Sequence, residues 1–269
     1  MQPPLLNNPV ISIGMPVYNG EKYIREALDS LLAQTFTDFE LIISDNCSTD
    51  ATAMICQVYV NKDSRIRCIR QNKNIGASAN FEFVLNQAKG RYFMWAACDD
   101  RWSPHFVDEL INALEKDKSY GLAFSNYLIR NLETNEEKRV SVRALDNKNR
   151  VFNYLLGILN MCPSLIYGIY RTELIKNTKF EFFDFADVYF ISELSLRARI
   201  RVLDDYLYIA GTKGERKPYS LTHGKIKRMP FLKKQYQVLS KYFSFPIRDL
   251  LFLFTCVFMI YSKIRLWRY

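Results

Sequence analysis

The first 130 residues alternate between short apolar runs and segments with the spacing of amphipathic helices. Each apolar run predicts a strand, and the runs are residues 10–15, 39–44, 66–69, 91–97 and 121–125. The helical segments between them are residues 21–34, 51 to about 60, 76–88, and one that starts at Ser103 and Pro104. In this last segment Ser103 suits the cap and Pro104 the first helical position. Strands separated by helices of this length indicate parallel βαβ units with both faces of the sheet covered.

Polar residues follow three of the predicted strands. Asn19 comes after the first strand, Asp45 after the second, and Asp99 with Asp100 after the fourth. The carboxyl ends of parallel strands lie at one edge of a sheet, where ligands of such folds bind, so we expect a site there. The chain has no G-x-G-x-x-G and no G-x-x-x-x-G-K-[ST] loop, which disfavours dinucleotide enzymes and P-loop ATPases.

The pattern becomes irregular after Thr134. Residues 133–150 are highly charged and predict an exposed excursion, and mixed helical and strand-like pieces follow it. We therefore predict one α/β domain over residues 1–212, with a first half of about 9–130 and a second half of 131–212. Residues 213–269 form a separate C-terminal extension in this interpretation.

Charge is concentrated in that extension. Residues 213–269 hold 13 Lys and Arg against two acids, which gives this segment a net charge of +11. Because the whole chain has a net charge of +9, the remaining residues have a net charge of −2. An apolar run of 12 residues, 250–261, lies between Arg248 and the cluster Lys263, Arg265, Trp267 and Arg268. A membrane-spanning helix needs about 20 residues.

This combination favours peripheral contact with an anionic membrane, through an interfacial or re-entrant segment. The alternative for residues 250–261 is a helix buried in the core or in an oligomer interface. A basic tail also suits nucleic acid, but the apolar run argues against that partner.

The six cysteines are scattered without a C-x-x-C pair, which is typical of reduced thiols in the cytosol. The N-terminus lacks the features of a signal peptide. We expect a cytoplasmic protein at the inner face of the cell membrane.

Several segments together resemble the family 2 glycosyltransferases, which have the GT-A fold. The matching segments are residues 11–24 (ISIGMPVYNGEKYI), 31–50 (LLAQTFTDFELIISDNCSTD), 74–80 (NIGASAN), 88–92 (AKGRY) and 98–102 (CDDRW). The resemblance is strong from residue 9 to about 106 and weaker to 197. It implies a mostly parallel sheet sandwiched by helices, followed here by the basic helical tail.

The resemblance also implies a nucleotide site at the ends of the first two strands. By position, the residues that contact the base and ribose are Pro16, Val17, Tyr18 and Glu21. Asp45 matches the acidic residue that bonds uracil or ribose in family members. Two alternatives stay open: Tyr18 packs in the core at a strand end, and Asp45 only forms a turn by capping the amides of Ser48 and Thr49.

Asp99 and Asp100 match the family's D-x-D-type metal motif. A hard divalent cation, Mn²⁺ or Mg²⁺, neutralises the donor diphosphate and stabilises the leaving group. The family pattern is often Asp-x-Asp-Asp, and its first position is Ala97 here. Asp99 is then the expected metal ligand, and Asp100 is expected to bond the sugar or ribose. The alternative is a turn that only leads into the helix near Ser103.

Family members supply the catalytic base from the second half, at the start of a helix. Residues 185–197 fit, which makes Asp187 the candidate, with Asp184 and Glu193 as alternatives. An acid at this position also complements a helix dipole without any catalytic role. The segment 163–171, with Tyr167, resembles one that shapes the acceptor side. The basic tail contributes weaker candidates for the diphosphate: Arg216, Lys217 and His223.

The implied function is transfer of a sugar, with inversion, from a UDP- or dTDP-sugar to a glycan or lipid-linked acceptor in cell-surface polysaccharide synthesis. The rival hypothesis is an inactive nucleotide-binding or scaffold protein of the same fold, which only Ala97 supports. A nucleotidyltransferase is a more distant alternative. It needs a Gly-rich, basic loop after the first strand, and residues 16–20 lack one.

Overall fold

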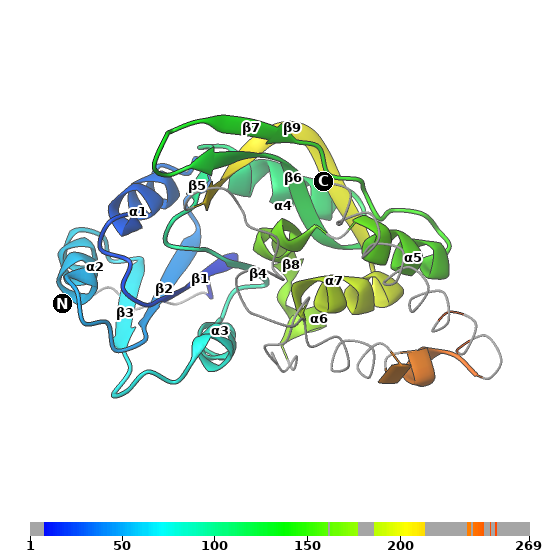
Figure 1. The fold of residues 1–269 in the computed structure, drawn as a ribbon, viewed down its shortest axis with the longest axis horizontal. Coiled ribbons are helices and arrows are strands. Elements are labelled where there is room, and N and C mark those ends of the chain that lie inside the picture. The colour runs from blue at the N-terminus through cyan, green and yellow to red at the C-terminus, as the bar shows by residue number, and fades with distance from the viewer. Residues whose placement is uncertain are drawn as a thin grey trace.

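The computed structural model describes residues 8–160, 162–176 and 186–212, together with 236, 237, 239–244, 248 and 251 of the C-terminal segment. Within these residues one nine-stranded sheet runs through the molecule, with helices packed on it (Figure 1). The strand order is β3-β2-β1-β4-β8-β6-β9-β5, and β7 pairs with β6 beside this path. The predicted α/β architecture is confirmed.

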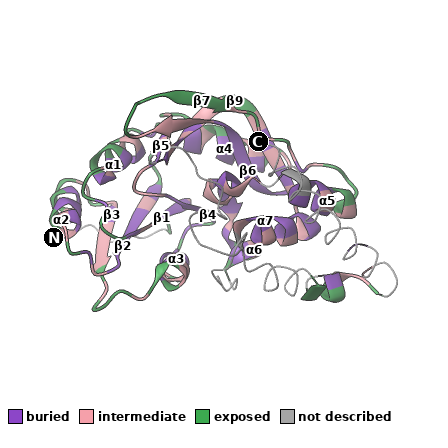
Figure 2. Cartoon of the chain, viewed as in Figure 1, coloured by how far each residue is buried: buried purple, intermediate pink, exposed green. Residues whose placement is uncertain are grey.

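The first half is the parallel part of the sheet. Its strands are β1 (Ile11–Val17), β2 (Phe39–Asp45), β3 (Ile66–Arg70) and β4 (Tyr92–Trp95), and β1 pairs in parallel with both β2 and β4. Its helices are α1 (Ile24–Leu32), α2 (Thr52–Lys62) and α3 (Ala77–Asn86). The four strands and three helices appear where the sequence predicts them, and the apolar runs of β1, β2 and β4 are buried on both faces (Figure 2).

The second half makes the sheet mixed rather than parallel throughout. Its two long strands, β6 (Tyr120–Asn131) and β9 (Arg199–Thr212), pair in parallel and arch over the molecule (Figure 1). The short strand β8 (Ile169–Arg171) lies between β4 and β6 and is antiparallel to both. The fifth predicted strand therefore does not extend the parallel row directly.

Shorter elements complete this half. They are β5 (Arg101–Trp102), α4 (Phe106–Lys116), β7 (Glu137–Val140), α5 (Arg150–Asn160), the 3-10 helix Pro163–Tyr167, α6 (Thr172–Ile175) and α7 (Ala186–Arg197). Strand β7 is largely exposed, as the charged segment predicts. Leu145 is the exception in that segment, because it is fully buried and bridges to Ile200.

Helix α4 begins later than predicted. Ser103 and Pro104 form a turn before the helix, and the first helical residue is Phe106. The side chain of Gln34 takes the capping role, because it accepts the N–H of Val107 at 3.0 Å and donates to the Ser103 carbonyl at 2.7 Å. A cap supplied by a side chain just beyond α1 leaves no local sequence signal near Ser103, so the Ser-Pro prediction was wrong.

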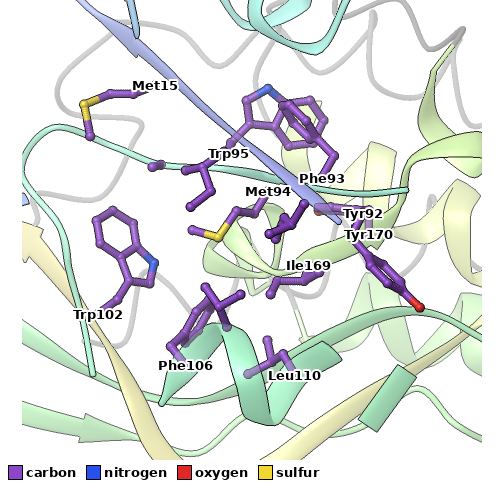
Figure 3. Close-up of a cluster of buried hydrophobic side chains, with 14 of the residues drawn as sticks. Met15, Tyr92, Phe93, Met94, Trp95, Trp102, Phe106, Leu110, Ile169 and Tyr170 are labelled. Atoms are coloured by element: carbon purple, nitrogen blue, oxygen red, sulfur yellow. The ribbon is translucent and has the colours of Figure 1, made fainter. Parts of the chain in front are cut away.

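The main core lies between the sheet and its helices. Strand β4 contributes large side chains to it, including Phe93 and Trp95, which meet edge to face with ring centroids 4.8 Å apart. Trp102 and Phe106 reach the same cluster from the chain that follows β4 (Figure 3). This aromatic packing anchors the segment on both sides of Asp99 and Asp100.

A second apolar cluster joins the C-terminal segment to α5 and α7. Leu239 and Leu251 are buried in it against Tyr154, Ile158 and Leu196. Lys241 also pairs with Glu193 of α7 at 3.5 Å. Of the apolar run 250–261, only position 251 lies within the described residues. No helix of the described chain is long and apolar enough to cross a membrane.

The second cluster predicts a stability effect far from the sheet edge. Leu239→Ala should lower the free energy of unfolding by about 2–5 kcal/mol, because it removes a fully buried side chain and leaves a cavity. Met54→Ala, at a side chain that is 67% exposed, is the control and should change little. Urea unfolding measures both. Equal stability of Leu239→Ala and the parent would show that the segment does not dock on α5 and α7.

Candidate nucleotide-sugar site

Side-chain hydrogen bonds hold together the loops that follow β1 and β2. The amide of Asn19 donates to Ser48 Oγ at 2.9 Å, and the Asn19 side chain accepts the Thr49 amide at 2.9 Å. Glu21 accepts the Ala51 amide at 2.9 Å, so its carboxylate caps the start of α2. These bonds bring the first two predicted polar clusters to one edge of the sheet.

The candidate base-binding residues occupy different positions in this loop. Pro16 is half-buried beside Ser44, and Val17 is buried beside Asp45. Tyr18 is 48% exposed, which excludes the alternative that it packs in the core. Its ring is therefore open to a ligand, and an aromatic face suits a flat base.

Asp45 ends β2 and is completely buried. Its Oδ1 accepts the Ser48 amide at 3.0 Å, so the turn-forming alternative is correct for one oxygen. Its Oδ2 is buried without a hydrogen-bond partner in the structure, and the nearest cation, Arg70 Nη1, is 3.6 Å away. That distance is an ion pair but too long for a hydrogen bond. A buried carboxylate oxygen without a donor is costly, which makes Oδ2 a candidate ligand contact.

Arg70 is a further candidate site residue, which the sequence analysis missed. It ends β3 directly beside Asp45 in the parallel register, and its Nη2 donates to the Ser48 carbonyl at 2.8 Å. Its side chain is 52% exposed, so the guanidinium also faces solvent. The sequence feature that could have identified Arg70 is its position, as a basic residue directly after the third predicted strand.

The turn after β4 brings Asp99 and Asp100 to the same edge. Asp99 is half-buried, and Asp100 is nearly fully buried. A Cβ added to Gly20 would lie 2.9 Å from Cys98 Sγ, so the β1 loop packs directly against this turn. Asp100 Oδ1 accepts the Gly211 amide at 2.8 Å, and its Oδ2 accepts the Tyr208 hydroxyl. Asp100 therefore has a structural role besides the predicted contact with the donor.

Tyr167 is influenced by both the Asp99–Asp100 turn and the candidate base. Burial raises the pKa of the Tyr167 phenol, and negative charge on Asp100, Asp99 and Asp187 raises it further. All three carboxylates are therefore near enough to act on this half-buried tyrosine, although Asp187 lies 87 positions beyond Asp100 in the chain. Asp187 is half-buried in the first turn of α7, and its Oδ1 accepts the Val188 amide at 2.8 Å.

Four other candidates lie outside the described residues: Asp184, Arg216, Lys217 and His223. Glu193 is two turns along α7 from the Asp187 end. Its carboxylate pairs with Lys241 at 3.5 Å.

Carboxylates such as that of Asp99 are suitable ligands for a divalent cation that is also coordinated by the diphosphate of a donor. Within the described residues, no group of three His, Cys, Asp or Glu side chains could hold a metal ion. Mg²⁺ in nucleotide sites needs only one or two protein carboxylates, because phosphate oxygens and water complete its shell. Asp99 fits that limited role, and the residues do not fit a metal site built by protein alone.

Comparison with known proteins identifies the family. The model of glycosyl transferase family 2 matches residues 12–178. An uncharacterized glycosyltransferase of Rickettsia prowazekii is 30% identical over 72% of this chain, and the match spans 64% of its own length. The Escherichia coli UDP-Glc:α-D-GlcNAc-diphosphoundecaprenol β-1,3-glucosyltransferase WfaP is 33% identical over 66% of this chain and 67% of its own.

A solved structure supports the fold. The S. aureus protein TarS, residues 1–349 in complex with UDP-GlcNAc, superimposes with a TM-score of 0.67 at 22% identity, over 90% of this chain and 70% of that one. The expected GT-A fold is thereby confirmed. The chain belongs to glycosyl transferase family 2.

Proposed function

We propose that the chain transfers a sugar, with inversion, from a UDP- or dTDP-sugar to a glycan or lipid-linked acceptor in the synthesis of cell-surface polysaccharide. The observation that carries this proposal is Asp45 Oδ2, a buried carboxylate oxygen with no hydrogen-bond partner at the edge where the three loops meet. Uracil and thymine each present an imide N–H, and ribose presents hydroxyls, so any of these donors satisfies that oxygen. Exposed Tyr18 supplies an aromatic surface beside it.

The relatives support a nucleotide-sugar donor. The name of the E. coli relative gives UDP-Glc as donor and a diphosphoundecaprenol-linked acceptor, and the TarS structure holds UDP-GlcNAc. A donor placed with its base at Asp45 extends its diphosphate along the loop edge toward Asp99. Asp99 would hold a divalent cation there, and that cation would neutralise the diphosphate and stabilise it as a leaving group.

Asp187 is the proposed general base. The acceptor hydroxyl oxygen attacks the anomeric carbon, the bond from that carbon to the diphosphate oxygen breaks, and the hydroxyl proton passes to the Asp187 carboxylate. The start of α7 favours negative charge at this position. Tyr167 is near enough to Asp187 and to the Asp99–Asp100 turn for their charges to raise its pKa, so it would line the space in which the two substrates meet.

The acceptor and location follow from the tail. An acceptor with a lipid anchor lies at a membrane surface, and the tail carries the net of +11 that an anionic surface attracts. We propose that the protein works in the cytoplasm as a peripheral protein at the inner face of the cell membrane. Leu239 and Leu251, in the middle of this tail, pack on α5 and on α7, the helix that carries Asp187.

Replacing Asp99 tests the metal-dependent part of the proposal. Asp99→Ala should lower transfer by about 10²-fold or more, because the diphosphate charge loses its stabilisation. It should also weaken UDP-sugar binding in Mn²⁺ or Mg²⁺ and leave the far-UV circular dichroism unchanged. The control is Asp205→Ala, at an exposed position of β9. Full activity in Asp99→Ala, or wild-type activity that a chelator does not change, would contradict the proposal.

Replacing Asp187 separates proton transfer from donor binding. Asp187→Asn should lower kcat by about 10²-fold or more and leave donor affinity nearly unchanged. Glu193→Gln, on the same helix, should stay active because its partner is Lys241. Steady-state kinetics with equilibrium binding of UDP measures both effects. An active Asp187→Asn beside an inactive Asp184→Asn would move the base to Asp184.

Neutralising the end of the tail tests membrane contact. A triple Gln variant of Lys263, Arg265 and Arg268 should bind phosphatidylglycerol vesicles about 100-fold more weakly, since each charge contributes about 1 kcal/mol near an anionic surface. Flotation at low and high salt measures binding, which should weaken with salt and persist in part through apolar contact. The control triple neutralises exposed Lys62, Lys116 and Lys148. If the parent ignores such vesicles, residues 250–261 serve as a core or oligomer helix instead.

A further inference from the structure

Strand β9 contacts the Asp99–Asp100 turn from more than a hundred residues away in the sequence. The strand β5, which directly follows the turn, pairs with β9 in antiparallel register, with Trp102 opposite Tyr208. The Ser103 amide donates to the Leu207 carbonyl at 2.8 Å, which extends the same ladder. The turn is thus held between β4 on one side and β9 on the other.

Each oxygen of the Asp100 carboxylate accepts a hydrogen bond from this strand. Tyr208, which is fully buried, donates its hydroxyl to Oδ2, and the Gly211 amide donates to Oδ1 at 2.8 Å. A buried carboxylate needs such donors, because leaving it without them costs several kcal/mol. Hydrogen bonds to a charged acceptor are also stronger than neutral ones. These two bonds therefore fix the direction of the turn.

Gly211 also meets the backbone of Asp99. A Cβ added to Gly211 would lie 2.1 Å from the Asp99 carbonyl oxygen, so no other residue fits without moving the turn. The Tyr208 ring is fixed in its turn by aromatic neighbours. They include Phe124, at 5.5 Å between ring centroids, Tyr127 at 5.9 Å, and Trp102 and Tyr167 at 6.0 Å each.

We propose that Tyr208 and Gly211 are positioning residues for transfer: through Asp100 and the Asp99 backbone, they hold the Asp99 carboxylate where it meets a cation on the donor diphosphate. The inference rests on the proposed role of Asp99. Neither residue touches substrate in this assignment. Their effect is on how well the turn is preorganised for the metal–diphosphate complex.

The test is UDP affinity measured by isothermal titration with Mn²⁺ and with EDTA. Tyr208→Phe keeps the ring packing and removes only the hydroxyl donor to Asp100. The gain in UDP affinity that Mn²⁺ gives should fall about tenfold, and the affinity in EDTA should stay at the wild-type value. A residue that only supports the fold would change the two affinities together.

Tyr92→Phe is the matched control. Tyr92 is also fully buried and also donates its hydroxyl to a carboxylate, that of Glu115, but it begins β4, at the opposite end from the turn. Loss of the Tyr92 hydroxyl should lower the thermal stability of the protein and leave the gain in UDP affinity from Mn²⁺ unchanged. A second pair of variants makes the same comparison, with Gly211→Ala as the test and Gly157→Ala as its control. The added Cβ clashes in the first and has ordinary contacts of 3.4 Å or more in the second.

A double mutant shows whether Tyr208 acts through Asp100. In an Asp100→Ala background, Tyr208→Phe should cause no further loss of the Mn²⁺ gain, whereas independent effects would add. A Mn²⁺ gain in Tyr208→Phe equal to that of the wild type and Tyr92→Phe would overturn the positioning role and leave the role of Asp99 intact. A wild-type protein that binds UDP equally in Mn²⁺ and EDTA would overturn both.

Discussion

The buried carboxylate of Asp100 is the contact on which the candidate site depends. It lies in the turn that carries Asp99, yet its hydrogen-bond donors, Tyr208 and the Gly211 amide, belong to the last strand of the sheet. A charge at this depth is stable only with those donors in place. The same two bonds therefore satisfy the charge, close the second half over the first, and fix the direction in which Asp99 faces the loop edge.

The first half of the chain is organised differently, with hydrogen bonds between its loops and few buried charges. Asn19, Ser48 and Thr49 join the loops after β1 and β2, and Glu21 caps α2. Asp45 Oδ1 accepts the Ser48 amide within this framework, whereas Asp45 Oδ2 has no hydrogen-bond partner. These hydrogen bonds already order the loops before a ligand binds, so binding costs little further conformational entropy. The one buried acceptor that they leave is suited to a hydrogen-bond donor such as an imide N–H.

Periodicity and strand-end chemistry were enough to predict the first half. The apolar runs that become β1, β2 and β4 are buried on both faces, so they carry a signal that does not depend on distant partners. The second half was not predictable in the same way. Strand β8 has three residues, and its place between β4 and β6 is set by pairing alone. Tyr208 gave no signal, because its role depends on an aspartate 108 positions earlier, and Arg70 was only a basic residue ending a weak strand.

The central claim is that Asp45, Asp99 and Asp187 belong to one nucleotide-sugar site at the carboxyl edge of the sheet. A crystal structure of the full chain with UDP and Mn²⁺, with the metal located by its anomalous signal, tests it most directly. The expected result places Mn²⁺ at coordination distance from an Asp99 carboxylate oxygen, about 2.0–2.2 Å, with the uracil N–H or a ribose hydroxyl on Asp45 Oδ2. Mn²⁺ bound away from Asp99, or a UDP whose base and ribose leave Asp45 Oδ2 without a donor, would contradict it.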